Sequence, residues 1–131
     1  MKFTRKLTVT AALAAALLGG CSSMSMSMPD QPAMMTGGML TGPNGMTLYT
    51  FDRDPVAGGK SVCNGPCANN WPPLMAKATD KPMGDYTIIT RDDGSKQWAL
   101  KGKPLYYWSK DSKAGDKTGD GVANNAWHIV R

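Results

Sequence analysis

Residues 45–54 read GMTLYTFDRD, and residues 102–111 read GKPLYYWSKD. Both segments follow the pattern Gly-x-x-Leu-Tyr-x-(Phe/Trp)-x-x-Asp, and the second begins 57 positions after the first (102 minus 45). The shared residues are Gly45, Leu48, Tyr49, Phe51 and Asp54 in the first copy and Gly102, Leu105, Tyr106, Trp108 and Asp111 in the second. Each copy is followed by an Ala-Asn-Asn segment and a tryptophan, Trp71 or Trp127. Since internal repetition indicates a structural unit used twice, the sequence predicts a domain made of two equivalent halves.

Each copy of the motif predicts a β-strand that carries an aromatic pair. Side chains alternate between the two faces of a strand, so Tyr49 and Phe51 share one face, as do Tyr106 and Trp108. We expect the two pairs to meet near a pseudo-two-fold axis. Because large aromatic side chains are commonly buried, we expect a core position for them rather than a platform on which a ligand stacks.

A carboxylate follows each aromatic pair at the point where the strand should end. Asp54 and Asp111 can there accept backbone N–H groups and hold the following loop in place. A catalytic pair of carboxylates is the alternative. It is disfavoured because each half carries its own copy in an equivalent position.

The rest of the chain predicts a mainly-β fold. The β-rich runs 86–91 and 96–100 flank an Asp-Gly turn and lead into the second motif, which predicts a three-stranded meander. A further strand is expected at 127–130, and one helical turn at 68–71. We therefore expect residues 39–131 to form a small sandwich or barrel-like domain of two pseudo-symmetric hairpin or meander repeats, with at most short helical turns.

The first twenty residues have the character of a lipoprotein signal peptide. A basic start precedes an apolar run, residues 7–18, that is too short to span a bilayer. The run ends in Leu18-Gly19-Gly20-Cys21, which resembles the lipobox of bacterial lipoproteins. The resemblance implies removal of residues 1–20, lipidation of Cys21, and, since Ser22 follows, sorting to the outer membrane, facing the periplasm. An ordinary signal peptide with a chance cysteine is the alternative.

Residues 21–38 are rich in methionine, serine and proline, which predicts a flexible tether. Thioether sulfur is a soft ligand that suits Cu(I). The candidate metal ligands are Met24, Met26, Met28, Met34 and Met35. Two interpretations stay open, a copper-trapping segment and a low-complexity spacer that tolerates methionine. The spacer is favoured because soft ligands alone do not demonstrate a site.

Two of the three cysteines, Cys63 and Cys67, remain once Cys21 is lipidated. In an oxidising compartment such a pair is expected to form a disulfide. The gap of three residues differs from the two-residue gap of thioredoxin-like motifs. A structural clip is therefore favoured over a thiol-redox site.

Composition excludes several classes of function. The net charge of +5 falls to +2 without Lys2, Arg5 and Lys6, since 12 basic and 10 acidic residues remain. Such a balance argues against nucleic acid as a partner. All ten acidic residues are aspartates, so a catalytic glutamate is excluded. No base partner is marked for His128, the single histidine, and the sequence therefore predicts no enzyme of the triad or histidine–metal type.

These motifs, with CNGPCANNWPPL at 63–74 and GDKTGDGV at 115–122, resemble one family. It comprises the predicted bacterial lipoproteins with a Tyr-x-(Phe/Trp/Tyr)-x-x-Asp motif, also called the secreted repeat of unknown function. The resemblance covers roughly residues 39–131 and implies an envelope location and a repeat architecture, without a reaction. We expect a lipid-anchored envelope lipoprotein that is a non-enzymatic binding or structural module, with metal handling by the methionine tether as the alternative. The expected partners are the membrane, through the lipid, and an unidentified envelope protein or metal.

Overall fold

A computed structural model describes residues 31–131. The expected signal peptide lies outside these residues, as do Cys21 and the candidate ligands Met24, Met26 and Met28. The expected tether lies inside them only from residue 31 onward.

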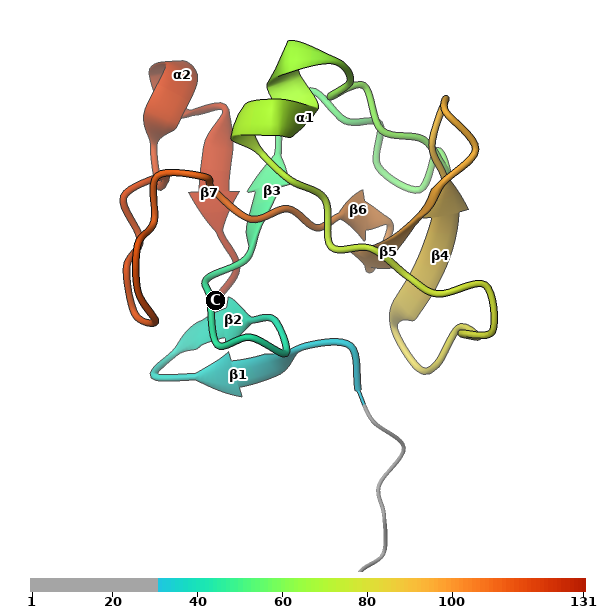
Figure 1. Ribbon diagram of the computed structural model, residues 1–131, viewed down its shortest axis with the longest axis horizontal. Coiled ribbons are helices and arrows are strands. Elements are labelled where there is room, and N and C mark those ends of the chain that lie inside the picture. The colour runs from blue at the N-terminus through green and yellow to red at the C-terminus, as the bar shows by residue number, and fades with distance from the viewer. Residues whose placement is uncertain (1–30) are drawn as a thin grey trace, which may run out of the picture. The chain divides into compact units, whose positions relative to one another are not determined.

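Residues 31–131 contain seven short strands and two short helices, joined by turns and loops, so the predicted mainly-β class is confirmed. In chain order the elements are β1 (Met34–Thr36), β2 (Met39–Thr41), β3 (Tyr49–Phe51), α1 (Pro66–Asn70), β4 (Tyr86–Thr90), β5 (Lys96–Leu100), β6 (Lys103–Pro104), α2 (Val122–Asn125) and β7 (Trp127–Ile129). Figure 1 shows α1 and α2 at one end of the domain and the β1–β2 hairpin at the other.

The strands form three small antiparallel sheets. β1 pairs with β2, β3 pairs with β7, and β4, β5 and β6 form the expected meander. Isolated bridges between Thr41 and Thr47 and between Tyr49 and Tyr106 link these sheets. In the β3–β7 pair, Thr50 lies opposite His128, which is 78 positions later in the sequence (128 minus 50). Long-range pairing therefore closes the fold.

The β1–β2 hairpin is the counterpart of the β4–β5 hairpin. Leu48 N donates to Leu40 O at 2.9 Å, and Leu105 N donates to Trp98 O at 3.0 Å, which makes β2 equivalent to β5. The sequence interpretation placed residues 34–38 in the tether and began the domain at 39. The structure corrects that boundary, because the first repeat needs β1 as the outer strand of its hairpin.

The repeated glycine of the motif has a conformational cause. Gly45 and Gly102 have φ values of +81° and +84°, in the left-handed region that side chains other than glycine disfavour. A Cβ on Gly102 would also lie 2.7 Å from the backbone nitrogen of Ala57. The left-handed backbone therefore favours glycine at the turn that enters each motif strand, and the close approach of Ala57 adds a second constraint at Gly102.

The motif strands are shorter than the sequence predicts. Within the motif segments 45–54 and 102–111, the regular strands cover only Tyr49–Phe51 and Lys103–Pro104. Tyr106 instead forms single bridges, to Tyr49 on one side and Pro73 on the other. The pairing at Tyr106 is therefore limited to isolated bridges and does not extend into a ladder.

The two helical segments differ in kind. α1 begins with Pro66, whose fixed φ suits the first turn of a helix. α2, which the sequence did not predict, contains positive φ values of 60°, 60° and 65° at Ala123, Asn124 and Asn125. It is therefore a turn through the left-handed region, and asparagine tolerates that region better than most residues do.

The core has two parts. One is aromatic and is built around Tyr49, Tyr106, Trp71 and Trp127. The other is aliphatic with one indole, and its buried members are Ala33, Leu40, Leu48, Leu74, Trp98 and Leu105. The leucines of the two motifs, Leu48 and Leu105, thus face the second cluster while the tyrosines face the first, as alternation along a strand requires.

Candidate functional site

Tyr49 and Tyr106 lie on the pseudo-two-fold axis that relates the repeats. Tyr49 N donates to Tyr106 O at 2.7 Å, and Tyr106 N donates to Tyr49 O at 3.0 Å. Both side chains are fully buried, with 0% exposure. The two motif tyrosines therefore pair equivalent positions of the two repeats directly with each other.

The phenol groups cross this axis. The hydroxyl of Tyr49 donates to Oδ2 of Asp111 at 2.6 Å, and the hydroxyl of Tyr106 donates to Oδ2 of Asp54 at 2.6 Å. Each repeat thus supplies the tyrosine for the carboxylate of the other. The shared Tyr and Asp positions are a reciprocal cross-brace between the halves.

The other oxygen of each carboxylate holds a loop. Oδ1 of Asp54 accepts the backbone N–H of Val62 at 2.8 Å, and Oδ1 of Asp111 accepts that of Thr118 at 3.0 Å. Both aspartates are buried. This is the backbone-accepting role expected from the spacing, with the contact to the tyrosine of the opposite repeat added to it.

Burial dominates the electrostatics of the cross-brace. Burial raises the pKa of Asp54, while the Tyr106 hydroxyl, the Val62 N–H and the Arg91 guanidinium lower it. The pKa of each tyrosine is raised well above its usual value, first by burial and then by the hydrogen bond to the carboxylate. Both phenols therefore stay protonated and donate hydrogen bonds to the neighbouring aspartates.

Four aromatic rings from both repeats stack in a column beside the cross-brace. Trp71 and Trp127 form its centre, with ring centroids 3.7 Å apart and planes at 3°. Phe51 stacks on Trp127 at 4.2 Å and Trp108 stacks on Trp71 at 3.9 Å, so each outer ring belongs to the repeat opposite its inner neighbour. We call these four rings the aromatic column.

Each buried tyrosine meets the column edge-on. Tyr49 contacts Trp71 at a centroid distance of 5.4 Å and 78°, and Tyr106 contacts Trp127 at 5.1 Å and 87°. These are the offset and T-shaped geometries that aromatic rings prefer. The tyrosines and the column therefore form one continuous set of rings.

The sequence interpretation put both members of each aromatic pair in the core. The structure buries the tyrosines but leaves Phe51 and Trp108 half-exposed at the two ends of the column. The central positions belong to Trp71 and Trp127, which were outside the candidate list. The signal that could have identified them was the tryptophan after each Ala-Asn-Asn segment.

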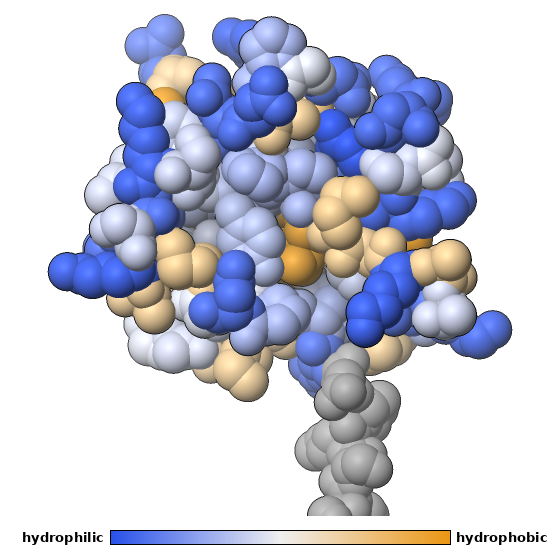
Figure 2. Space-filling model, viewed as in Figure 1, coloured by the Kyte–Doolittle hydropathy of each residue, from blue (hydrophilic) through white to orange (hydrophobic). Residues whose placement is uncertain are grey.

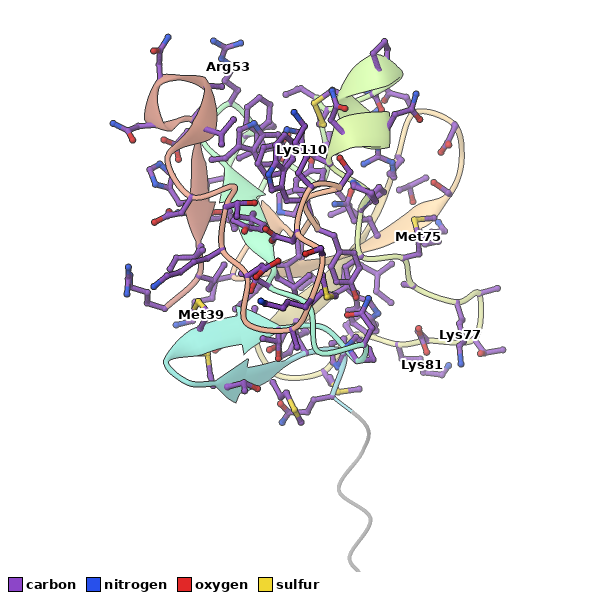
Figure 3. All side chains as sticks on the ribbon, turned by 60° about the vertical axis from the view of Figure 1, so that its left-hand side comes forward. Met39, Arg53, Met75, Lys77, Lys81 and Lys110 are labelled. Atoms are coloured by element: carbon purple, nitrogen blue, oxygen red, sulfur yellow. A yellow bond between two sulfur atoms is a disulfide. The ribbon has the colours of Figure 1, made fainter. Side chains whose placement is uncertain are left out.

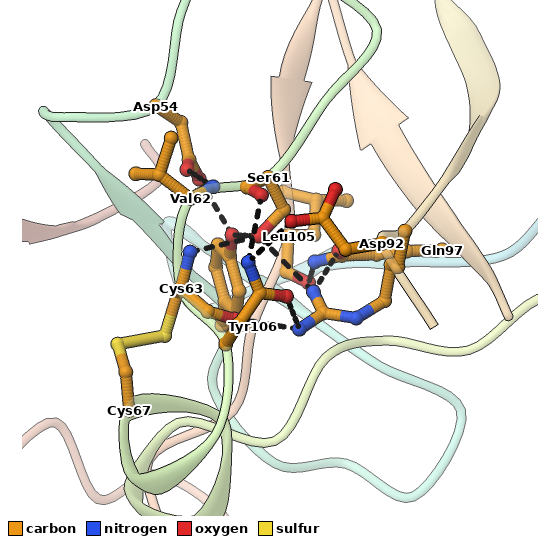
Figure 4. Close-up of a disulfide and its surroundings, with 11 residues drawn as sticks. Asp54, Ser61, Val62, Cys63, Cys67, Asp92, Gln97, Leu105 and Tyr106 are labelled. Carbon is orange, nitrogen blue, oxygen red and sulfur yellow. Dashed lines mark hydrogen bonds between the residues drawn. A yellow bond between two sulfur atoms is a disulfide. The ribbon is translucent and has the colours of Figure 1, made fainter. Parts of the chain in front are cut away.

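The predicted disulfide between Cys63 and Cys67 is present, and it closes the loop that enters α1. Beside it lies Arg91, a buried arginine that the sequence did not single out. Arg91 donates to Cys63 O at 2.6 Å and to Oε1 of Gln97 at 2.7 Å. We call this set, with Ser61 and Asn64, the arginine cluster. Figure 4 shows the surroundings of the disulfide, with Ser61, Gln97 and Tyr106 labelled.

The arginine cluster joins Ser61, Cys63 and Asn64 of the first repeat to Arg91 and Gln97 of the second. Arg91 also donates to the Ser61 hydroxyl at 3.1 Å, and Ser61 is hydrogen-bonded to the Tyr106 hydroxyl. In the second repeat Gly119 N instead donates directly to the Tyr49 hydroxyl at 3.1 Å. One half of the cross-brace therefore has a cation beside it and the other does not.

An open cleft of about 570 Å³ lies next to the disulfide. Arg91 lines it, together with polar side chains from the loop after β4 and from α1. The lining residues are Asn64, Gly65, Ala68, Asn69, Pro73, Met75, Arg91, Asp92, Asp93 and Ser95. We call it the arginine cleft; its donors and acceptors suit a polar ligand, and the half-exposed Met75 adds an apolar contact.

A second cleft, of about 350 Å³, lies where β3 and β7 meet the turn between β5 and β6. Its walls include Thr50, Lys101, Lys103 and His128. His128 Nε2 lies 2.9 Å from Oδ2 of Asp52, so the histidine has a carboxylate partner that the sequence interpretation missed. The sequence could not show this partner, because Asp52 and His128 come together only through the β3–β7 pairing, which sets Thr50 opposite His128.

Two of the five candidate metal ligands, Met34 and Met35, lie among the described residues. Met34 and Met35 lie on β1 with 61% and 55% exposure. Met39 and Met75 lie on opposite sides of the view in Figure 3. Within residues 31–131, no group of three or more His, Cys, Asp or Glu side chains is placed to hold a metal ion.

One face of the domain can be followed in the space-filling view of Figure 2. On the face shown in Figure 2, polar and charged residues cover most of the area, and apolar residues form only small groups. Among residues 31–131, no helix is both long and apolar enough to cross a membrane.

Comparison with known proteins identifies the repeats. A family model described as a secreted repeat of unknown function matches residues 35–75 and again residues 87–131. The two matches begin in β1 and β4, which agrees with the hairpins being equivalent. No curated protein and no solved structure matches the chain.

Proposed function

The chain belongs to the family described as a secreted repeat of unknown function, and on that premise we propose that it is a lipid-anchored, non-enzymatic binding module of the cell envelope. Its anchor is the lipidated Cys21, in the outer membrane and facing the periplasm. The membrane is its first partner, and nucleic acid is not a partner. The folded domain presents the arginine cleft to a ligand or to an envelope protein.

The observation that carries the proposal is the contrast between the buried polar groups and the arginine cleft. Asp54, Asp111, Tyr49 and Tyr106 are bonded to one another and to backbone groups. Such committed groups support the fold and are not free to act on a substrate. Polar side chains of the arginine cleft also make hydrogen bonds, as Asn64 does to Asp92. They differ in that Asn69, Asp92 and Asp93 are exposed and line an open space, where a ligand can reach them.

A site-specific photo-crosslinker tests the cleft in living cells. Asn69 lies in the arginine cleft, and Asn125, 56 positions later, is its exposed counterpart in the second repeat. We expect a crosslinking residue at 69 to give one covalent adduct of defined mass, and the same residue at 125 to give none. Equal labelling at both positions, or none at either, would contradict a binding role for this cleft.

The anchor is tested separately. In cells, Cys21→Ser is expected to abolish incorporation of labelled fatty acid and to leave the protein unprocessed or released from the membrane fraction. Ser22→Ala is the control, because it keeps the thiol and its neighbourhood. Unchanged labelling of the Cys21→Ser variant would contradict lipid anchoring.

A second candidate function is Cu(I) handling by Met24, Met26, Met28, Met34 and Met35. The exposure of Met34 and Met35 favours it, because both thioethers on β1 are accessible to solvent. Native mass spectrometry of the full chain after Cu(I) loading tests it against a variant with all five methionines replaced by leucine. Equal copper content in the two proteins would exclude this function.

A further inference from the structure

We propose that the aromatic column is a one-electron relay, which takes an electron hole from an oxidant at Trp108, passes it through Trp71 and holds it on Tyr49 while Asp111 takes the phenol proton. The oxidant is any one-electron oxidant at the surface, such as an oxidised metal complex or an oxidising radical. This activity is independent of the lipid anchor and of ligand binding in the arginine cleft.

The entry point follows from exposure and from the chemistry of the rings. Trp108 is half-exposed, whereas Trp71 and Trp127 are 5% and 2% exposed. Phe51 is the other half-exposed ring of the column, but a benzene ring gives up an electron far less readily than an indole. Within the column, Trp108 is therefore the indole that reaches the surface. The Lys110 ammonium lies 5.7 Å from its ring centroid, and this positive charge disfavours keeping the hole on Trp108 rather than on the inner rings.

The path inward consists of two ring contacts. Trp108 and Trp71 stack at 3.9 Å and 26°, and Trp71 meets Tyr49 edge-on at 5.4 Å. Electron exchange weakens steeply with distance, so contact between rings makes each step short. The path therefore leads from the surface to a side chain with no exposed area.

The final step needs a base at the phenol, because a tyrosine that loses an electron becomes strongly acidic. Oδ2 of Asp111 accepts the Tyr49 hydroxyl at 2.6 Å. In this step one electron passes from Tyr49 to the oxidised Trp71, and the phenol proton moves to Oδ2 of Asp111. The products are a neutral tyrosyl radical, a neutral carboxylic acid and a reduced Trp71, while the surface oxidant has gained one electron in total.

The arginine cluster decides between the two tyrosines. Tyr106 also donates to a carboxylate at 2.6 Å and touches the column, but the Arg91 guanidinium lies beside it through Ser61. A positive charge opposes the loss of an electron. Tyr49 has only negative charges as ionic neighbours, Asp111 and Asp120. The hole therefore settles on Tyr49.

Flash oxidation of the full chain tests the relay. A photo-oxidised ruthenium tris-bipyridine complex is the oxidant, and electron paramagnetic resonance of freeze-quenched samples identifies the radical. We expect a tyrosyl signal in the wild type and in Tyr106→Phe, and its loss in Tyr49→Phe. The two variants are matched, since each removes one buried hydroxyl that donates to an aspartate. Equal loss in both, or retention of the signal in Tyr49→Phe, overturns the proposal.

A second pair of variants covers the case in which Tyr49→Phe does not fold. Trp108→Phe keeps an outer ring but removes the indole, so tyrosyl formation should be lost. Trp98→Phe removes an indole that packs in the other core cluster, so the signal should be retained. Equal yields in Trp108→Phe and Trp98→Phe overturn the proposed entry point.

Discussion

Tyr49 and Tyr106 pair backbone to backbone, and each sends its phenol to the aspartate of the opposite repeat. This exchange means that neither repeat can satisfy its own buried groups. A buried carboxylate without its hydrogen bonds is costly, so each half depends on the other to fold. The Tyr and Asp positions of the motif therefore join the two repeats to each other, in addition to forming part of each repeat.

Removal of either phenol hydroxyl should destabilise the domain. Tyr49→Phe and Tyr106→Phe each leave a buried carboxylate short of one donor, and we expect a loss of about 1–3 kcal/mol in the free energy of unfolding. Urea melts measure it. The control is Tyr86→Phe, whose hydroxyl has no hydrogen bond within the described residues, and its melt should lie within about 0.5 kcal/mol of wild type. Unchanged melts for both buried variants would contradict the cross-brace.

Removing a ring of the aromatic column should destabilise the domain, and the loss should be larger for a more buried ring. Trp127→Ala removes a central, buried ring and should cost about 3–5 kcal/mol, enough to endanger folding. Phe51→Ala removes a half-exposed ring at the end, and about half that cost is expected, since less area leaves water on folding. Thermal unfolding of the two variants measures the difference. A larger loss for Phe51→Ala than for Trp127→Ala would contradict the described order of burial.

Alkaline pH should unfold the protein through its tyrosines. An unfolded tyrosine has a pKa of about 10, whereas burial raises the pKa of Tyr49 and Tyr106 in the fold. Above that pH the folded state retains protons that the unfolded state has lost, so stability is full below about pH 10 and falls as the pH rises. Tyrosinate absorbance and circular dichroism, followed together, should change at one pH for these residues. Ionisation of every tyrosine in a protein that stays folded would contradict the expected link between tyrosine ionisation and unfolding.

The disulfide should be a moderate stabiliser of the first repeat. Cys63→Ala with Cys67→Ala opens a five-residue loop and should cost about 2 kcal/mol by loss of the chain-entropy constraint. The second repeat has Gly119 and Ala123 at the corresponding places and keeps the same architecture, so the fold should survive. Circular dichroism and urea melts of the double variant test this. Loss of the folded state would mean that the clip is indispensable.

Several features followed from sequence alone because their causes are local. Alternation and turn residues placed β4, β5 and β7, and the helical turn expected at 68–71 overlaps α1, which covers Pro66–Asn70. The tether was drawn too long because β1, at Met34–Thr36, has no apolar alternation of its own. Its strand character comes from pairing with β2. His128 likewise looked isolated because its partner, Asp52, lies 76 positions away.

The sequence by itself determined the existence of two repeats, the mainly-β class and the cysteine pair, because each is written in residue types at fixed spacing. Tertiary structure alone decided that the tyrosines exchange aspartates across the axis, that Trp71 and Trp127 rather than Phe51 and Trp108 hold the centre of the column, and that a buried Arg91 lies beside only one tyrosine. A repeat in sequence says which residues are equivalent. It does not say whether a residue contacts its own repeat or the other one, because that depends on how the two repeats pack together.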